Sequence, residues 1–91
     1  MNYQKAAKQI IKAVGGKRNI EDMSQCSTRL RFKLKDESKI HHEMLKAMES
    51  VIISFFRGDE YQILPKEGTN EIYQEMTRTS IGKILFGDFW A

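Results

Sequence analysis

The sequence predicts an α+β fold, a two-layer sandwich in which three helices cover one face of a four-stranded antiparallel sheet, in the order α-β-β-α-β-β-α. Three segments repeat apolar residues at helical spacing, and four shorter segments are typical of strands and follow one another in pairs. No segment has the length and glycine pattern of a nucleotide-binding β-α-β unit, so we expect the sheet to be built from hairpins. The 91 residues are 41% hydrophobic and 30% charged, which indicates one domain with a modest core and excludes a deep catalytic cavity.

The first 35 residues are expected to form a helix followed by a hairpin. Apolar residues at helical spacing run from about Tyr3 to Val14, and Gly15-Gly16 ends the helix. Residues 19–25 are short and mixed, which is typical of a weak edge strand or a loop. From Thr28 onward apolar and basic residues alternate, so one strand face is apolar and the other is basic. The basic face is therefore expected to meet solvent or a partner.

A second helix and a second hairpin are expected to follow. Asp36-Glu37-Ser38 offers a turn and a helix cap, and apolar residues from Ile40 to Met48 recur at helical spacing. Residues 51–56 are β-branched and aromatic, residues 57–60 have turn chemistry, and residues 61–64 return as the partner strand. Pro65 ends this hairpin because it cannot donate a ladder hydrogen bond.

The third helix and the residues after it are expected to differ in role. Thr69 or Asn70 can cap a helix that ends by residue 79. Residues 80–91 are too few to cross a bilayer and too apolar for a solvated linker. We therefore expect a domain over residues 1–79 and a tail over 80–91 that either packs on the domain or leads into a further one.

Charge and cysteine content restrict the function. Residues 1–35 hold nine Lys or Arg against two acidic residues, a balance of +7, whereas the remaining residues hold six against ten, a balance of −4. This asymmetry indicates a surface that meets an anion. Cys26 is the single cysteine and His41 and His42 are adjacent, so we expect no internal disulfide and no metal site. No apolar run of about 18 residues is present, which favours a reducing cytoplasm over insertion or secretion.

Cys26 and the residues after it form the candidate site. A lone cysteine is most often a small buried hydrophobe, but Arg29 and Arg31 follow on one strand face and would stabilise a thiolate. Ser27 and Thr28 add hydroxyl donors, and a tight turn there can aim backbone N–H groups at an anion. A thiolate surrounded by such donors suits a cysteine that carries a phosphoryl group. Acyl transfer is disfavoured because neither histidine is expected beside this loop.

Two other classes of function stay open. A nucleic-acid-binding module would use the basic strand to bind phosphates, although Phe32 is expected on the opposite face, where it cannot stack on bases. A redox sensor would oxidise Cys26 and could form only intermolecular or mixed disulfides. Binding that falls steeply with salt would indicate the first, and an oxygen adduct in the intact mass would indicate the second.

Four short motifs lie in a fixed order along the first 36 residues: Gly15-Gly16, Asn19-Ile20, Cys26-Ser27-Thr28-Arg29-Leu30-Arg31 and Lys35-Asp36. In this order and spacing they resemble the IIB domain of the glucose and β-glucoside branch of the bacterial phosphoenolpyruvate-dependent sugar phosphotransferase system. The resemblance covers about residues 3–78. The chain departs from the family pattern at Gln25, before the cysteine, and at Asp59-Glu60, where the second hairpin usually has glycines.

The resemblance implies a definite function. Cys26 would accept a phosphoryl group from a phosphohistidine of a IIA protein or domain and pass it to a sugar bound by the membrane-embedded IIC domain. The residues that would hold the phosphoryl group are Ser27, Thr28, Arg29 and Arg31. The resemblance implies no cofactor, no metal and no nucleic-acid partner, and a monomeric domain at the cytoplasmic face of the membrane. Residues 80–91 would then lead into a downstream IIC domain, with a free-standing IIB subunit as the alternative.

Overall fold

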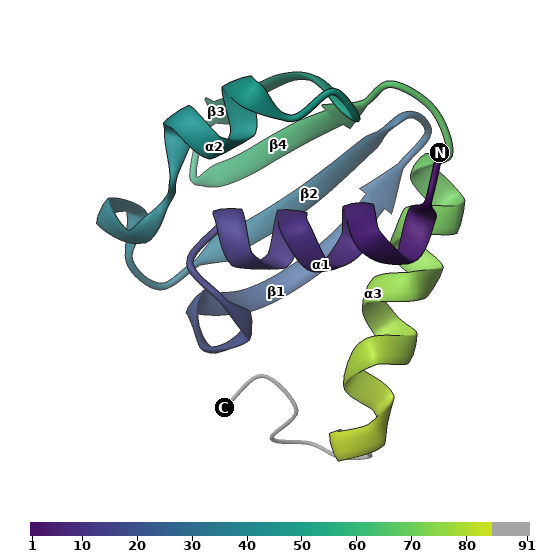
Figure 1. The fold of residues 1–91 in the computed structure, drawn as a ribbon. Helices are drawn as coiled ribbons and strands as arrows, with labels where there is room; N and C mark the ends of the chain where they lie inside the picture. Colours follow the sequence, from purple (N-terminus) through teal and green to yellow (C-terminus); the bar gives the residue numbers. More distant parts are fainter. Residues whose placement is uncertain (85–91) are drawn as a thin grey trace.

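The structure is a computed structural model that describes residues 1–84, with the side chains of residues 1–78. Within these residues three α-helices and a four-stranded antiparallel sheet follow one another in the predicted order, which confirms the fold class (Figure 1). The elements are α1 (Tyr3–Ala13), β1 (Ile20–Cys26), β2 (Arg29–Leu34), α2 (His42–Ala47), β3 (Val51–Arg57), β4 (Glu60–Pro65) and α3 (Thr69–Ile84). Short 3-10 turns at Lys17–Asn19 and Glu37–Lys39 lead into β1 and α2.

The sheet places the two hairpins side by side in the strand order β1-β2-β4-β3. In the first hairpin Cys26 lies opposite Arg29, and across β2 and β4 Arg31 lies opposite Gln62. Side chains alternate between the faces of a strand, so these residues share one face of the sheet. The helices cover the other face, and the face of Cys26 is left open (Figure 1).

The core lies between the helices and the apolar face of the sheet. All three helices and strands β1, β2 and β4 contribute side chains that are at most 1% exposed. The largest of these are Tyr61, Phe32, Ile10, Ile20, Leu30, Leu45, Ile63, Ile72 and Met76. The predicted alternation in β2 is therefore confirmed, because Leu30 and Phe32 are buried, Leu34 is partly buried and none of the basic residues is buried.

Asn19 joins the end of α1 to the turn after β2. Its side chain is 3% exposed, and Nδ2 donates to the carbonyl oxygens of Val14 at 2.8 Å and Asp36 at 3.0 Å. Its Oδ1 accepts from the Asp36 backbone N–H at 2.8 Å. Gly15, with φ +106°, packs so closely on this side chain that a Cβ there would lie 2.6 Å from Nδ2. The motifs at Gly15, Asn19 and Asp36 are therefore structural and fix where β1 begins.

Of the two alternatives left open for the residues after α1, an edge strand or a loop, the structure shows the strand. Residues 20–26 form an edge strand of the sheet, with a register irregularity between Ile20 and Asp22. Helix α3 continues to Ile84, past the expected end at residue 79, because a single glycine is tolerated inside a helix and no proline interrupts these residues. The rest of the expected tail, residues 85–91, lies outside the described residues. Among the described residues no helix has the length and apolar character needed to cross a membrane.

Candidate functional site

Cys26 is exposed at the end of β1, where the chain turns sharply into β2. Ser27 and Thr28 form the turn, and Ser27 has φ +55°, a left-handed conformation that is uncommon outside glycine. The turn returns the chain so that Arg29 lies directly opposite Cys26. The predicted tight turn is therefore confirmed, with the cysteine at its start.

The beginning of α3 holds this turn from two sides. The Thr69 hydroxyl donates to the Thr28 carbonyl oxygen at 2.7 Å, and Gln25 Nε2 donates to Asn70 Oδ1 at 2.9 Å. The two side chains that were alternative candidates to cap α3 thus both form hydrogen bonds with the first hairpin. The sequence offered no signal for these contacts. Thr69 and Thr28 are separated by 41 positions, and Asn70 and Gln25 by 45.

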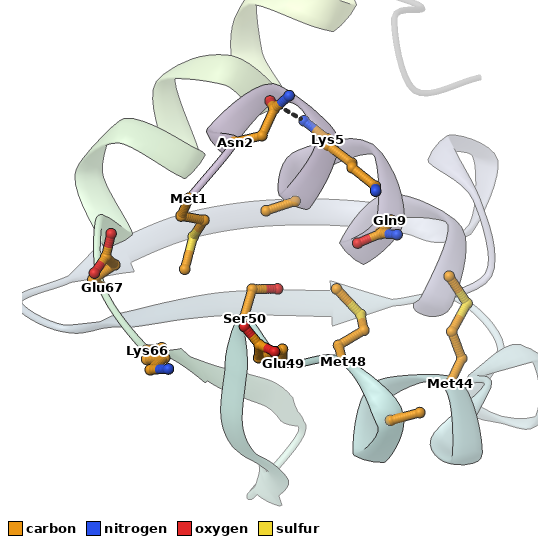
Figure 2. A pocket seen from close by; sticks show the side chains of 12 residues that line it. Met1, Asn2, Lys5, Gln9, Met44, Met48, Glu49, Ser50, Lys66 and Glu67 are labelled. Carbon is orange, nitrogen blue, oxygen red and sulfur yellow. Dashed lines mark hydrogen bonds between the residues drawn. The ribbon is translucent and has the colours of Figure 1, made fainter.

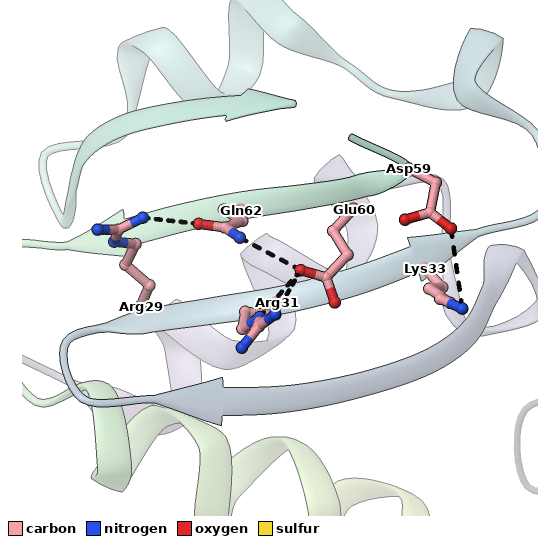
Figure 3. Close-up of polar contacts among 6 residues, drawn as sticks. All are labelled: Arg29, Arg31, Lys33, Asp59, Glu60 and Gln62. Carbon is pink, nitrogen blue, oxygen red and sulfur yellow. Dashed lines mark hydrogen bonds and ion pairs between the residues drawn. The ribbon is translucent and has the colours of Figure 1, made fainter. Parts of the chain in front are cut away.

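Arg29 and Arg31 lie on the open face, as predicted, but each already has a partner (Figure 3). Arg29 donates to Gln62 Oε1 at 2.8 Å, and its guanidinium carbon lies 5.8 Å from the centre of the Phe55 ring. Arg31 donates to Glu60 Oε1 from Nε at 3.0 Å, and its second terminal nitrogen is 2.8 Å from the same oxygen. Strand β4 therefore supplies the partners of both arginines.

Gln62 and Glu60 connect the two arginines into one network. Gln62 is 4% exposed although it belongs to the open face, and its Nε2 donates to Glu60 Oε1 at 3.3 Å. The hydrogen bond and the charge of Glu60 raise the pKa of the Arg31 guanidinium above its ordinary value, and Cys26 adds to this effect. Arg31 is thus held by an internal carboxylate in the hollow that it shares with Cys26.

All five predicted site residues line one open hollow of about 710 Å³. Its described walls are Cys26, Ser27, Thr28, Arg29, Arg31, Arg57, Asp59, Glu60 and Gln62. The last four were not predicted from the sequence, although Asp59-Glu60 stood out as a departure from the family pattern. An anion entering this hollow meets arginines from β2 and β3 and two carboxylates from the β3–β4 turn and β4.

A second hollow lies on the helical side of the sheet, between α1 and α2 (Figure 2). It measures about 680 Å³ and is lined in part by Met1, Met44 and Met48. No cysteine, histidine or arginine is among its described walls, so it lacks the chemistry of the first hollow. In the part of the chain that the structure describes, no group of three or more His, Cys, Asp or Glu could hold a metal ion.

Comparisons with known proteins agree with this geometry. The family described as "phosphotransferase system, EIIB" matches residues 8–40, which contain the Asn19 motif and the Cys26 hairpin. A crystal structure of one domain of the PTS system IIabc component from Clostridium difficile is 34% identical, with a TM-score of 0.76, covering 84% of this chain and 80% of that one. The chain belongs to the EIIB family. The resemblance identified from the motifs is therefore confirmed.

Curated relatives of this EIIB domain are sugar-specific components of the same system. A trehalose-specific EIIBC component of Bacillus subtilis is 44% identical over 87% of the chain, and a sucrose-specific EIIBC component of Staphylococcus xylosus is 40% identical over 86%. A β-glucoside-specific EIIBCA component of Halalkalibacterium halodurans is 40% identical over 84%. The chain spans only 12 to 17% of the length of these relatives.

Proposed function

We propose that this EIIB domain carries phosphoryl groups during sugar uptake and that Cys26 holds the group. The placement of Cys26 supports this proposal most directly. Its exposed thiol lies at the end of β1, opposite Arg29, and close enough to Arg31 to affect the pKa of that guanidinium. A sulfur nucleophile beside two arginines suits transfer of a dianionic group.

The chemistry consists of two displacements at phosphorus. The Cys26 thiolate attacks a phosphohistidine of IIA, forming an S–P bond as the N–P bond breaks, and the histidine leaves as neutral imidazole when its other nitrogen carries a proton. A hydroxyl oxygen of the sugar then attacks the same phosphorus, the O–P bond forms and the S–P bond breaks. The thiolate leaves with the bonding electrons, and the hydroxyl proton passes to a base of the sugar-binding domain.

The residues around Cys26 have separate roles in this proposal. Arg29 and Arg31 balance the negative charge on the phosphoryl oxygens, which grows as each bond breaks. Ser27 and Thr28 supply donors from the turn, which the hydrogen bond from Thr69 to Thr28 holds in place. A nucleic-acid role is disfavoured because Arg31 already pairs with Glu60, and the acidic Asp59 and Glu60 line the same hollow.

The partners follow from the relatives. Those relatives are EIIBC and EIIBCA components, so the proposed acceptor is a sugar held by a membrane-embedded IIC domain and the donor is a IIA protein or domain. In this arrangement residues 1–79 form the EIIB domain at the cytoplasmic face and residues 80–91 lead toward IIC. Relatives named for sucrose, trehalose and β-glucosides match this domain about equally well, so we place the choice of sugar outside it.

Intact mass spectrometry tests the proposal. The chain is incubated with phosphoenolpyruvate and the general phosphotransferase proteins in two parallel reactions. One reaction contains a IIA partner and the other does not. We expect one phosphoryl adduct that requires IIA, maps to Cys26 and is absent from Cys26→Ser. A phosphoryl group on another residue, or an unchanged mass under conditions that label a trehalose-type EIIB domain, would refute the assignment. An oxygen adduct would indicate redox chemistry.

A further inference from the structure

We infer that Glu60 acts as an internal anion that occupies Arg31 and thereby weakens the hold of the site on a phosphoryl group. One carboxylate oxygen of Glu60 accepts from Nε of Arg31 at 3.0 Å, lies 2.8 Å from its terminal nitrogen and accepts from Gln62 at 3.3 Å (Figure 3). The consequence for phosphoryl transfer rests on the proposed function, whereas the effect on anion binding does not.

Glu60 takes the edge of Arg31 that an incoming anion would use. The Nε and one terminal nitrogen of a guanidinium form the fork that binds carboxylates and phosphates through two hydrogen bonds. In this structure both nitrogens of that fork face Glu60 Oε1. A phosphoryl group on Cys26 must therefore displace the carboxylate or accept from the remaining donors of Arg31.

The net charge of the residues that line the hollow also supports weak binding of an anion. Its described walls carry three arginines and two carboxylates, which leaves a balance of +1 for a group that brings about two negative charges. The Glu60 side chain is 23% exposed and that of Arg31 is 37% exposed, so water screens this pair only in part. Removing the charge of Glu60 leaves Arg31 free for the anion.

A low affinity for the phosphoryl group suits a domain that must pass this group on. A group bound equally tightly before and during transfer gains nothing in rate, and an overly stable phosphocysteine would retain its phosphoryl group. Glu60 therefore lowers the stability of the phosphorylated state relative to the free state. Arg31 still contributes charge when the phosphorus is transferred, because its guanidinium lines the same hollow as Cys26.

Titration with inorganic phosphate at constant ionic strength tests the inference without phosphoryl transfer. We expect the backbone amide NMR signals of residues 26–29 to report an affinity for phosphate about threefold to tenfold higher in Glu60→Gln than in the wild type. Glu60→Asp keeps the charge and should stay within about twofold of the wild type. Asp59→Asn is the matched control, since it removes the same charge from a carboxylate that is 81% exposed and lies 3.8 Å from Lys33 Nζ. Asp59→Asn should change the logarithm of the phosphate affinity by less than half as much as Glu60→Gln does.

A second measurement connects Glu60 to transfer. At equilibrium with the same donor, the ratio of phosphorylated to free Cys26 should rise in Glu60→Gln by the factor seen with phosphate. Equal or weaker phosphate binding in Glu60→Gln, an equal shift in Asp59→Asn, or no detectable binding in any variant would overturn the inference. If phosphate binding tightens as expected but the wild type is never phosphorylated, the proposed function fails and the role of Glu60 in anion binding stands.

Discussion

Arg29 and Arg31 lie two residues apart on one face of β2, yet different partners hold them. An amide oxygen of Gln62 and the ring of Phe55 position Arg29, whereas the carboxylate of Glu60 positions Arg31. Both arrangements use the planar guanidinium, which a lysine cannot reproduce. The two side chains are therefore expected to act as oriented donors and not as interchangeable surface charges.

Replacing either arginine by lysine should slow phosphoryl transfer from IIA while leaving the fold intact. We expect Arg29→Lys and Arg31→Lys each to lower the rate by roughly 10-fold to 1,000-fold, because the charge remains but the fork is lost. Rapid-quench kinetics with a phosphorylated donor measure this rate. Lys33→Gln is the control on the same strand face and should transfer within about twofold of the wild type. Wild-type rates in both lysine variants would mean that the turn alone stabilises the phosphoryl group.

Asp36 gives the fold a dependence on pH. The Ser38 hydroxyl donates to its Oδ1 at 2.6 Å and the Ser38 backbone N–H donates at 2.9 Å; these bonds, with the charge of Lys39, hold the pKa of Asp36 below its usual range. The folded state thus prefers the ionised form. The resulting stability is fully present above the unfolded pKa, near 3.9, and is lost as the pH falls through the folded value.

Thermal unfolding at pH 6 and pH 3 checks this dependence. Asp36→Asn should be less stable than the wild type at pH 6, and the difference should be smaller at pH 3, because the stability contributed by ionised Asp36 is lost as the pH falls below the unfolded pKa toward the lowered folded pKa. Glu37→Gln alters the adjacent exposed carboxylate and is the control. A difference between Asp36→Asn and the wild type that stays constant with pH would show that ionisation of Asp36 does not stabilise the fold.

The link between α1 and β1 depends on one glycine of the Gly15-Gly16 pair more than on the other. Both have positive φ, +106° and +92°, but a Cβ at Gly15 would lie 2.6 Å from Asn19 Nδ2 and 2.9 Å from Lys39 Cβ, while nothing lies within 4 Å of a Cβ at Gly16. We expect Gly16→Ala to cost about 1 kcal/mol of unfolding free energy from backbone strain, and Gly15→Ala about 3 kcal/mol or more. Urea denaturation measures both, and equal costs would contradict the packing argument.

The contact between α3 and the Cys26 turn can be tested separately from stability. Thr69→Val keeps the shape of the side chain but removes its hydrogen bond to Thr28, which should cost about 1 kcal/mol and speed amide hydrogen exchange at residues 26–28. Thr77→Val removes a similar bond, to the Gln74 carbonyl within the same helix. That control should leave exchange at the turn unchanged. Equal exchange rates in the two variants would show that α3 does not restrain the turn.

The sequence predicted the features that depend on a local repeating pattern of apolar and polar residues. The alternation from Thr28 to Lys35 predicted β2 and its open face, and the structure places Cys26, Arg29 and Arg31 around one hollow, as the sequence led us to expect. The role of Cys26 as nucleophile stays a prediction. Helix α3 was predicted too short, because the apolar residues from 80 onward were assigned to a separate tail. The partners of the arginines were missed because Gln62 and Glu60 are 33 and 29 positions away from them. Such contacts depend on how the hairpins pair, which no local pattern encodes.

The whole molecule presents two unlike sides. The helical layer covers the core and holds the structural motifs around Asn19, whereas the open sheet face carries Cys26 and its charged network. If the domain is joined to IIC as we propose, the linkage keeps Cys26 near the sugar at an effective concentration of about millimolar. Weak, repeated docking would then suffice for transfer. Weak docking of the domain is consistent with the low affinity for the phosphoryl group that we infer for the site.

The most direct test of this account is a single-turnover chase from Cys26 to sugar. The chain is labelled with radioactive phosphate through IIA, separated from the donor, and mixed with sugar and membranes that contain the IIC domain of a sucrose or trehalose relative. We predict that label leaves Cys26 and appears on the sugar with one rate constant, in equal amounts, and that Cys26→Ser supports no transfer. Sugar phosphate that forms while Cys26 keeps its label would contradict the account.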